Sequence, residues 1–465
     1  MSKASLPAFD PQTAPVLVGA SVKRTLARMA LPMLAGTFAM NAYHLTDTWF
    51  VSRLGTLPLA AMGFAFPVIM LLRFITGGLG TGITVLVSHA IGRHSHDEAA
   101  RVVTHGIGFT MAVAALMAAA GYATIDVVFA QLGADAGVRP LVKQYMQVWY
   151  LGAVVTALPM IGNGILISAG DSGTAARLIM LGTGLNLVFD PFLIFGWLGL
   201  PALGLRGAAL ATLLAQTIAT VRLFVLLSKK HGLLRYRHRE LPQLPATVRR
   251  ILGFGVPAIL SMILMPISAA VITRLLGSFG NAAVAAAGAA QRLEMLAFVI
   301  PMALGISLTP FISQNFGAER IDRIREAMRV STRFALLYGA GVAAGFFVAA
   351  PRLARIFSDD PEVIRTLVAY IRIIAFGYGM MEVHRYCGFA LTGLHKPGQT
   401  TALNAVRVLV FLIPLSCLGA YLHGVRGIFF GRLVTDVAVG AIGIAWVHRT
   451  LSAFPAAVRS GSHER

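Results

Sequence analysis

The segment Ser88-His-Ala-Ile-Gly92 has a counterpart 225 residues further along the chain, Ser313-Gln-Asn-Phe-Gly317. Gly204-Leu-Arg-Gly207 recurs in the same way as Gly424-Val-Arg-Gly427, at an offset of 220 residues. The spacing of prolines and glycines, 31 and then 29 residues, is repeated in Pro32, Gly63 and Gly92 and in Pro257, Gly288 and Gly317. Offsets that stay this constant indicate an internal duplication.

The composition indicates that the duplicated unit lies in a membrane. Of 465 residues 57% are hydrophobic and 12% are charged, whereas a soluble globular chain carries about 25% charged residues. A run of about 20 apolar residues is enough to span the hydrocarbon layer. We predict spans at 27–51, 58–88, 102–122, 141–168, 174–197, 207–228, 250–275, 284–313, 330–350, 363–390, 401–422 and 427–448.

The fold class predicted is therefore an all-α polytopic membrane protein with twelve transmembrane helices in two six-helix lobes. An even number of spans separates equivalent positions, so the two halves run in the same direction across the membrane. Parallel repeats of this kind build transporters that hold the substrate between their lobes and alternate its access to the two sides.

The net charge of +20 agrees with this topology, because the basic residues fall in the breaks between apolar runs. Cytoplasmic loops collect Lys and Arg, and such loops also attract anionic lipid headgroups, so we do not expect a nucleic-acid partner. The strongly basic stretch 229–250 predicts that both termini are cytoplasmic. The domains expected are a tail at 1–26, an N-lobe at 27–228, a linker and hinge at 229–249, a C-lobe at 250–448 and a tail at 449–465.

Acidic residues at membrane depth mark candidate functional sites, since a charge at the bilayer centre costs about 2.5–3.5 kcal/mol on insertion scales. Only five of the 19 acids lie within predicted spans, namely Asp47, Asp190, Glu294, Glu382 and Asp436.

The acids of the second half have basic neighbours in sequence. Asp436 has Arg432 at i−4, on the same helix face, which favours a structural ion pair. Arg292 lies close to Glu294, and Arg385 lies close to Glu382. For Glu294 and Glu382 an ion pair and a role in a relay or substrate cavity both stay open.

Asp47 and Asp190 have no cation at helical spacing. Burial disfavours a charged carboxylate, so each is expected to bind and release a proton near neutral pH or to bind a cation. Asn186 lies one helical turn before Asp190, and Pro191 removes a backbone donor beside it.

Further polar residues on the first predicted span extend the candidate site. Asn41, His44 and Thr48 follow the 3–4 spacing of one helix face, with Asp47 adjoining. His44 is either a proton relay or a hydrogen-bonded packing residue, and Asn41 either lines the cavity or bonds helix to helix. Tyr43 offers an aromatic face to a cationic substrate or an anchor at the membrane interface.

Several segments, in this order and spacing, resemble the multidrug and toxic compound extrusion (MATE) transporters, in particular the DinF-type branch. They are Leu31-Pro32, Asp47-Thr-Trp-Phe-Val-Ser-Arg-Leu-Gly55, Asn186-Leu-Val-Phe-Asp190-Pro191, Gly207-Ala-Ala-Leu-Ala-Thr212 and Gln314-Asn-Phe-Gly-Ala318. The resemblance implies an antiporter that exports organic, often cationic, compounds against entering protons or sodium ions. It adds Thr212 to the coupling site and implies that the first span bends at Pro32.

Coupling to H⁺ and coupling to Na⁺ both stay open at this point. Hard cations take carboxylate, amide and hydroxyl oxygens, so a Na⁺ site is expected at Asp47, Asn186, Asp190 and Thr212 if sodium is the coupling ion. Protons are the simpler expectation, because proton coupling needs only a protonatable acid. No other cofactor is expected, and the expected partners are organic cations and the lipid bilayer.

A flippase for a lipid-linked oligosaccharide, which would share the two-lobed fold, is the alternative function. It requires a cationic cavity for pyrophosphate, for which the embedded Arg73, Arg222, Arg292, Arg372, Arg385 and Arg407 are candidates. An enzyme is not expected, because the chain has no zinc-protease, serine-hydrolase or phosphate-loop motif. We expect a monomer in the plasma membrane of a prokaryote.

Overall fold

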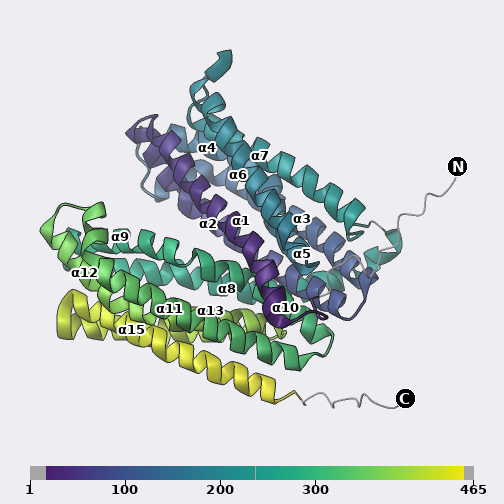
Figure 1. Ribbon diagram of the computed structural model, residues 1–465. Helices are drawn as coiled ribbons and strands as arrows, with labels where there is room; N and C mark the ends of the chain where they lie inside the picture. Colours follow the sequence, from purple (N-terminus) through teal and green to yellow (C-terminus); the bar gives the residue numbers. More distant parts are fainter. Residues whose placement is uncertain (1–16, 236, 455–465) are drawn as a thin grey trace. The chain divides into compact units, whose positions relative to one another are not determined.

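The computed structural model describes residues 17–235 and 237–454, apart from the side chains of residues 44 and 45. Every regular element in these residues is a helix (Figure 1), so the predicted all-α fold class is confirmed. The predicted tails at 1–26 and 449–465 lie in part outside the described residues.

The first half of the chain contains α1 (Val22–Ser52), α2 (Thr56–Gly92), α3 (His96–Gln131), α4 (Arg139–Leu151), α5 (Ala153–Ser168), α6 (Ser172–Phe195), η1 (Trp197–Gly199), α7 (Leu205–Val225) and η2 (Leu226–Lys230). The connecting segment contains η3 (His238–Gln243).

The second half contains α8 (Leu244–Gly277), α9 (Asn281–Ala297), α10 (Val299–Gly317), α11 (Ile321–Phe357), α12 (Pro361–Ile374), η4 (Ala375–Gly377), α13 (Tyr378–Gly393), α14 (Pro397–Ala405), η5 (Val406–Leu412) and α15 (Ile413–Ser452).

These helices make twelve transmembrane spans. In the described residues nine helical stretches are long and apolar enough to cross a membrane, and α4 with α5, which meet at 55°, form a tenth. The stretch Pro397–Ser452 contains two spans, because α15 breaks at His423 and Gly424, where φ is 60° at the glycine. The twelfth span is α1, whose 31 residues extend about 46 Å at 1.5 Å per residue.

The described chain divides into two compact units, residues 17 and 29–259 and residues 18–28 and 260–454. In the first, Phe129 of α3, Met146 of α4 and Ile194 of α6 are buried in one apolar core. In the second, Leu367 of α12 and Phe429 of α15 belong to a separate core. The chain passes from the first unit to the second within α8.

The basic segment after α7 belongs to the first unit and is hydrogen-bonded to α3. The backbone NH of Arg235 donates to Thr104 Oγ1 (3.2 Å), and that hydroxyl donates to the Arg235 carbonyl (3.0 Å). His105 Nδ1 lies 3.3 Å from Thr247 Oγ1 at the start of α8. The segment expected to be a hinge thus makes ordered contacts with α3.

Asp171 ties the start of α6 to the same segment. Its carboxylate accepts from Thr174 N (3.2 Å) at the helix N-cap and pairs with Lys230 (2.6 Å) and His231 (3.2 Å). Burial raises the pKa of Asp171, but the hydrogen bonds from His231, Lys230 and Thr174 outweigh burial and hold that pKa well below its usual value of 3.8.

Candidate functional site

Three helices of the first unit bring the predicted coupling residues together. Tyr43 and Asp47 lie on α1, Asn186 and Asp190 lie one turn apart on α6, and Thr212 lies on α7. Asp190 is fully buried, Asn186 is 2% exposed and Asp47 is 6% exposed. The structure therefore holds two carboxylates out of solvent in one part of the first unit.

Hydrogen bonds connect these residues in a chain. The hydroxyls of Tyr43 and Thr212 are 3.2 Å apart. With the Asn186 amide oriented to satisfy its neighbours, its nitrogen donates to Asp190 Oδ2 (2.9 Å) and its oxygen accepts from Thr212 Oγ1 and N (3.1 Å each). Asp190 Oδ1 is buried and has no hydrogen-bond partner in the part of the chain that the structure describes.

A close approach of α6 and α7 positions this chain. A Cβ on Gly207 would lie 2.2 Å from the Leu193 carbonyl oxygen, so only glycine fits there. The turn between the helices begins at Gly196, which has a left-handed φ of 76°. Leu203 N donates to the Leu193 carbonyl (3.0 Å) and closes the turn.

The charges of Asp47 and Asp190 are close enough to interact. Arg73 of α2 attracts Asp47 electrostatically, but neither acid has a salt bridge among the described residues. Arg53, the basic residue nearest to Asp47 in sequence, lies over the Trp49 ring instead (4.9 Å). Both carboxylates are thus buried without a paired cation.

Sequence reasoning missed two members of this cluster. Tyr145 of α4 is buried and feels the charges of Asp47 and Asp190, and Arg73 was considered only as a phosphate-binding candidate. Each is far from the two acids along the chain, so no helical spacing relates them. The only signal in the sequence was that Arg73 is a cation inside an apolar run.

The remaining candidates of α1 lie outside the hydrogen-bonded chain. Asn41 is half-buried, and Pro32 lies within the helix, before the acid-bearing turns. The side chain of His44 lies outside the described residues. Pro191 follows Asp190 directly within α6 and is buried, so α6 lacks one backbone donor next to the carboxylate.

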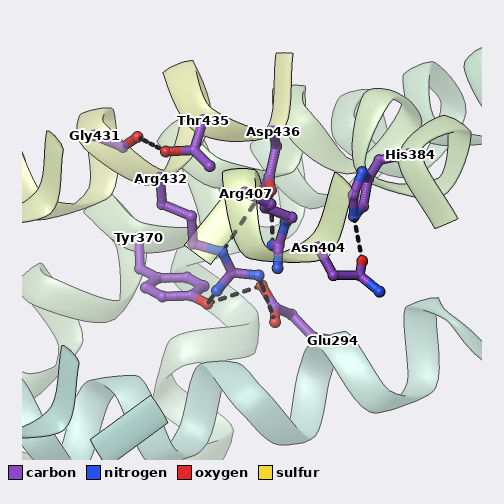
Figure 2. Close-up of polar contacts among 9 residues, drawn as sticks. All are labelled: Glu294, Tyr370, His384, Asn404, Arg407, Gly431, Arg432, Thr435 and Asp436. Atoms are coloured by element: carbon purple, nitrogen blue, oxygen red, sulfur yellow. Dashed lines mark hydrogen bonds and ion pairs between the residues drawn. The ribbon is translucent and has the colours of Figure 1, made fainter. Parts of the chain in front are cut away.

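The membrane-embedded acids of the second unit are paired, as Figure 2 shows for two of them. Arg432 forms a salt bridge with Glu294 (2.8 Å) and hydrogen-bonds Tyr370, whose hydroxyl donates to Glu294 (2.8 Å). Of the two alternatives left open for Glu294, the structure shows an ion pair, and the partner is Arg432 rather than the neighbouring Arg292. The partner comes from α15 because α9, α12 and α15 share one core.

The predicted pairing of Asp436 with Arg432 is confirmed, at 3.7 Å, and Arg407 makes a shorter contact with Asp436 at 2.9 Å. Glu382 is 1% exposed and pairs with Arg385 at 3.2 Å, as its sequence neighbours indicated. Each embedded acid of the second unit therefore has an arginine partner, in contrast to Asp47 and Asp190.

The described residues contain no group of three or more His, Cys, Asp or Glu side chains placed to hold a metal ion. A Na⁺ ion would therefore depend on the mixed oxygens of Asp47, Asn186, Asp190 and Thr212. The Asn186 oxygen and the Thr212 hydroxyl already bond to each other, which leaves the carboxylate oxygens as the least engaged atoms of the cluster.

Comparison with known proteins adds independent information. The profile of the MatE family matches residues 32–192 and 257–418, once in each half of the chain. The FAD transporter of Shewanella oneidensis is 34% identical over 91% of this chain and 94% of its own length. The probable multidrug resistance protein YoeA of Bacillus subtilis is 26% identical over 77% of this chain and 78% of its own length.

Among solved structures, the MATE transporter VcmN of Vibrio cholerae in its bent form is 29% identical to this chain. The two structures superpose with a TM-score of 0.89, and the match covers 93% of this chain and 97% of VcmN.

Proposed function

The chain belongs to the MatE family of membrane transporters, and from this premise we propose that it is a proton-coupled exporter of small organic compounds, with Asp47 and Asp190 as the coupling carboxylates. The observation that carries this proposal is the buried Asp190 Oδ1, which has no hydrogen-bond partner among the described residues and lies near a second buried carboxylate. Two close carboxylates without a paired cation favour the uptake of a proton. The same groups can release it when their surroundings change.

The hydrogen-bond chain supports protons over sodium. Na⁺ needs several free oxygen ligands, whereas the Asn186 oxygen already accepts two hydrogen bonds from Thr212. A proton needs only one free carboxylate oxygen. A Na⁺ site at Asp47, Asn186, Asp190 and Thr212 is the alternative, and the experiment below separates the two.

In the proposed cycle, the deprotonated carboxylates favour binding of a cationic amphiphile from the cytoplasmic side. Protonation of Asp47 and Asp190 then removes negative charge and favours release on the outer side. The bend occurs at Pro32 of α1 and next to Pro191 of α6, where the helix lacks a backbone hydrogen bond. The difference in proton affinity between the two conformations drives the change.

The names of relatives support organic compounds as substrates, since one is a probable multidrug resistance protein. A second substrate class, a flavin dinucleotide, is favoured by the 34% identity to an FAD transporter over 91% of this chain. Such a substrate is anionic, whereas the first class is cationic. Measuring whether an organic cation or FAD competes for transport therefore distinguishes the two substrate classes.

The flippase alternative requires free embedded arginines in a cationic cavity. Of its six candidates, Arg407 and Arg385 form salt bridges with Asp436 and Glu382, and Arg73 is attracted to Asp47, which weakens this alternative.

We further propose that the protein works as a monomer in the plasma membrane of a prokaryote, with both termini in the cytoplasm. The basic segment 229–250 supports this orientation.

Dye transport in inverted membrane vesicles tests the coupling. An imposed pH gradient should drive transport by the wild type, and an imposed Na⁺ gradient should not. Asp47→Asn and Asp190→Asn should abolish the pH-driven component at equal expression. Asp126→Asn is the matched control, because it removes an exposed carboxylate that, among the described residues, forms a salt bridge with Lys143 alone (2.6 Å).

Transport driven by a Na⁺ gradient alone would show that Na⁺, and not H⁺, is the coupling ion at these residues. Full pH-driven transport by either membrane-embedded variant would overturn the assignment of that residue.

A further inference from the structure

A pocket of about 450 Å³ opens beside α3 in the first unit, away from the carboxylate cluster. One wall is apolar and comes from α3, with Ile107, Gly108, Phe109, Met111 and Ala112, and the facing wall comes from Leu241, Leu244 and Val248. Gly108, Met111, Ala112 and Leu241 are exposed. The pocket is therefore lined by apolar side chains and opens on the surface of the unit.

One end of this pocket is cationic. Arg235 and Arg237 line it together with His105 and Glu240. The Arg235 Nε is buried and has no hydrogen-bond partner among the described residues. The Thr104 hydroxyl, bonded to both the NH and the carbonyl of Arg235, fixes the backbone that carries this guanidinium.

The acids beside these arginines leave them open to another anion. Asp97 lies 3.7 Å from Arg235 and 3.4 Å from Arg237, and its side chain is 69% exposed. Glu240 lies 3.6 Å from Arg237. The ion pairs of Asp97 are long and Asp97 is exposed, so they contribute little stability. An anion with several oxygens can therefore exchange with Asp97.

The pocket also lies where the membrane surface is expected. The helix α3 begins at His96, which places Met111, fifteen residues later, about 22 Å along the helix axis. The cationic end lies closer to the start of α3 and belongs to the basic segment placed in the cytoplasm, whereas the apolar wall continues into the predicted span 102–122.

We propose that this pocket binds one anionic phospholipid of the cytoplasmic leaflet. The phosphodiester lies against Arg235 and Arg237, and one acyl chain lies along Gly108, Met111 and Ala112. Arginine donates to phosphate oxygens through a fork of NH groups, which supplies the missing acceptor for the Arg235 Nε. The bound lipid would hold the segment after α7 on α3. The site does not depend on the identity of the coupling ion.

Native mass spectrometry of the full-length purified protein tests this site, with phosphatidylglycerol and phosphatidylcholine of matched acyl chains offered in equal amounts. The wild type should retain one phosphatidylglycerol at least about fivefold more often than phosphatidylcholine. Arg235→Gln combined with Arg237→Gln should reduce this preference to parity. Arg239→Gln, a neighbouring basic residue that does not line the pocket, should leave it unchanged.

A second variant tests the acyl slot without changing charge. A Cβ on Gly108 meets nothing within 4 Å, so Gly108→Leu should fill the pocket, displace the lipid and leave the fold intact. Gly341→Leu is the matched control, since Gly341 is an exposed glycine of α11 with the same open space.

The proposal is overturned if the wild type retains both lipids equally, or if the arginine pair or Gly108→Leu leaves retention unchanged. It is also overturned if water-soluble glycerol phosphate competes as well as phosphatidylglycerol, because the apolar wall would then play no part.

Discussion

Gly207→Ala tests whether the close crossing of α6 and α7 builds the coupling site. The new methyl group would lie 2.2 Å from the Leu193 carbonyl oxygen, and ordinary contact begins near 3.4 Å. The two helices therefore have to separate by about 1.2 Å, since packed interiors have no free space to absorb the overlap. Gly207 is buried in the first turn of α7, which carries Thr212, and faces α6, which carries Asn186.

Thr212 lies five residues after Gly207, about 7.5 Å further along α7. Moving the two helices apart by about 1.2 Å would lengthen the 3.1 Å contacts of Thr212 with Asn186 beyond hydrogen-bonding distance. A buried polar group left without its partner costs about 1–3 kcal/mol, which corresponds to a loss of about 5- to 150-fold in rate if the site must form for coupling.

The assay is the initial rate of pH-driven dye transport in vesicles, normalised to the amount of folded protein. Gly184→Ala is the control, because a Cβ at Gly184 of α6 meets nothing within 4 Å. Gly207→Ala and Thr212→Val remove the same contact, so the double variant should lose little more than the worse single variant. Wild-type rates for Gly207→Ala, or losses that add in the double variant, would show that the close crossing of α6 and α7 does not build the coupling site.

Two further predictions concern stability. Arg432→Met removes the partner of the half-buried Glu294, whose side chain is 12% exposed. The free energy of unfolding should fall by about 3 kcal/mol, the lower end of the range for buried pairs, and Arg432→Met with Glu294→Gln should recover much of that loss. Thermal unfolding in detergent measures both, and equal stability of the single and double variants would show that the pair is not coupled. Asp171→Asn keeps the helix cap, because Asn caps as well as Asp, but it removes the negative charge that pairs with Lys230 and His231. The loss of these charge contacts should destabilise the protein by about 1 kcal/mol at pH 7. Because its partners hold the pKa of Asp171 below 3.8, the wild-type carboxylate stabilises fully above that pH and progressively less as the pH falls below it. The stability difference between the wild type and Asp171→Asn should therefore shrink in acid, and a difference that stays constant down to pH 3 would contradict this.

The fold could be predicted from the sequence because its determinants repeat along the chain. The recurring glycines and prolines revealed the duplication, and the apolar runs gave twelve spans. The predicted resemblance to the MATE family is confirmed by the family profile in both halves. Span ends were less accurate, since α1 begins at Val22, inside the predicted tail, and α3 extends to Gln131.

Helix breaks were predictable only where the sequence marks them. Gly424, in a repeated motif, does interrupt α15. The bend between α4 and α5 falls at Gly152, which nothing in the apolar run 141–168 distinguishes from the other glycines of the chain.

The site could be predicted where its members share a helix. Asn186 and Asp190 are one turn apart, so helical periodicity placed them on one face, and Arg432 with Asp436 was found in the same way. Partners that meet only through packing could not be found: Arg73 beside Asp47 and Arg432 beside Glu294 join residues from different helices. Arg292 lies close to Glu294 in sequence, but residues two apart on a helix do not face each other, so the partner of Glu294 comes from another helix.

Proton release on substrate binding follows the coupling ion itself. An organic cation would be added to the purified protein in weakly buffered solution while the pH is recorded. We predict that the wild type and Asp126→Asn release protons, that Asp190→Asn releases none, and that added Na⁺ changes neither result. Undiminished proton release from Asp190→Asn, or substrate binding by the wild type without any release, would contradict the account.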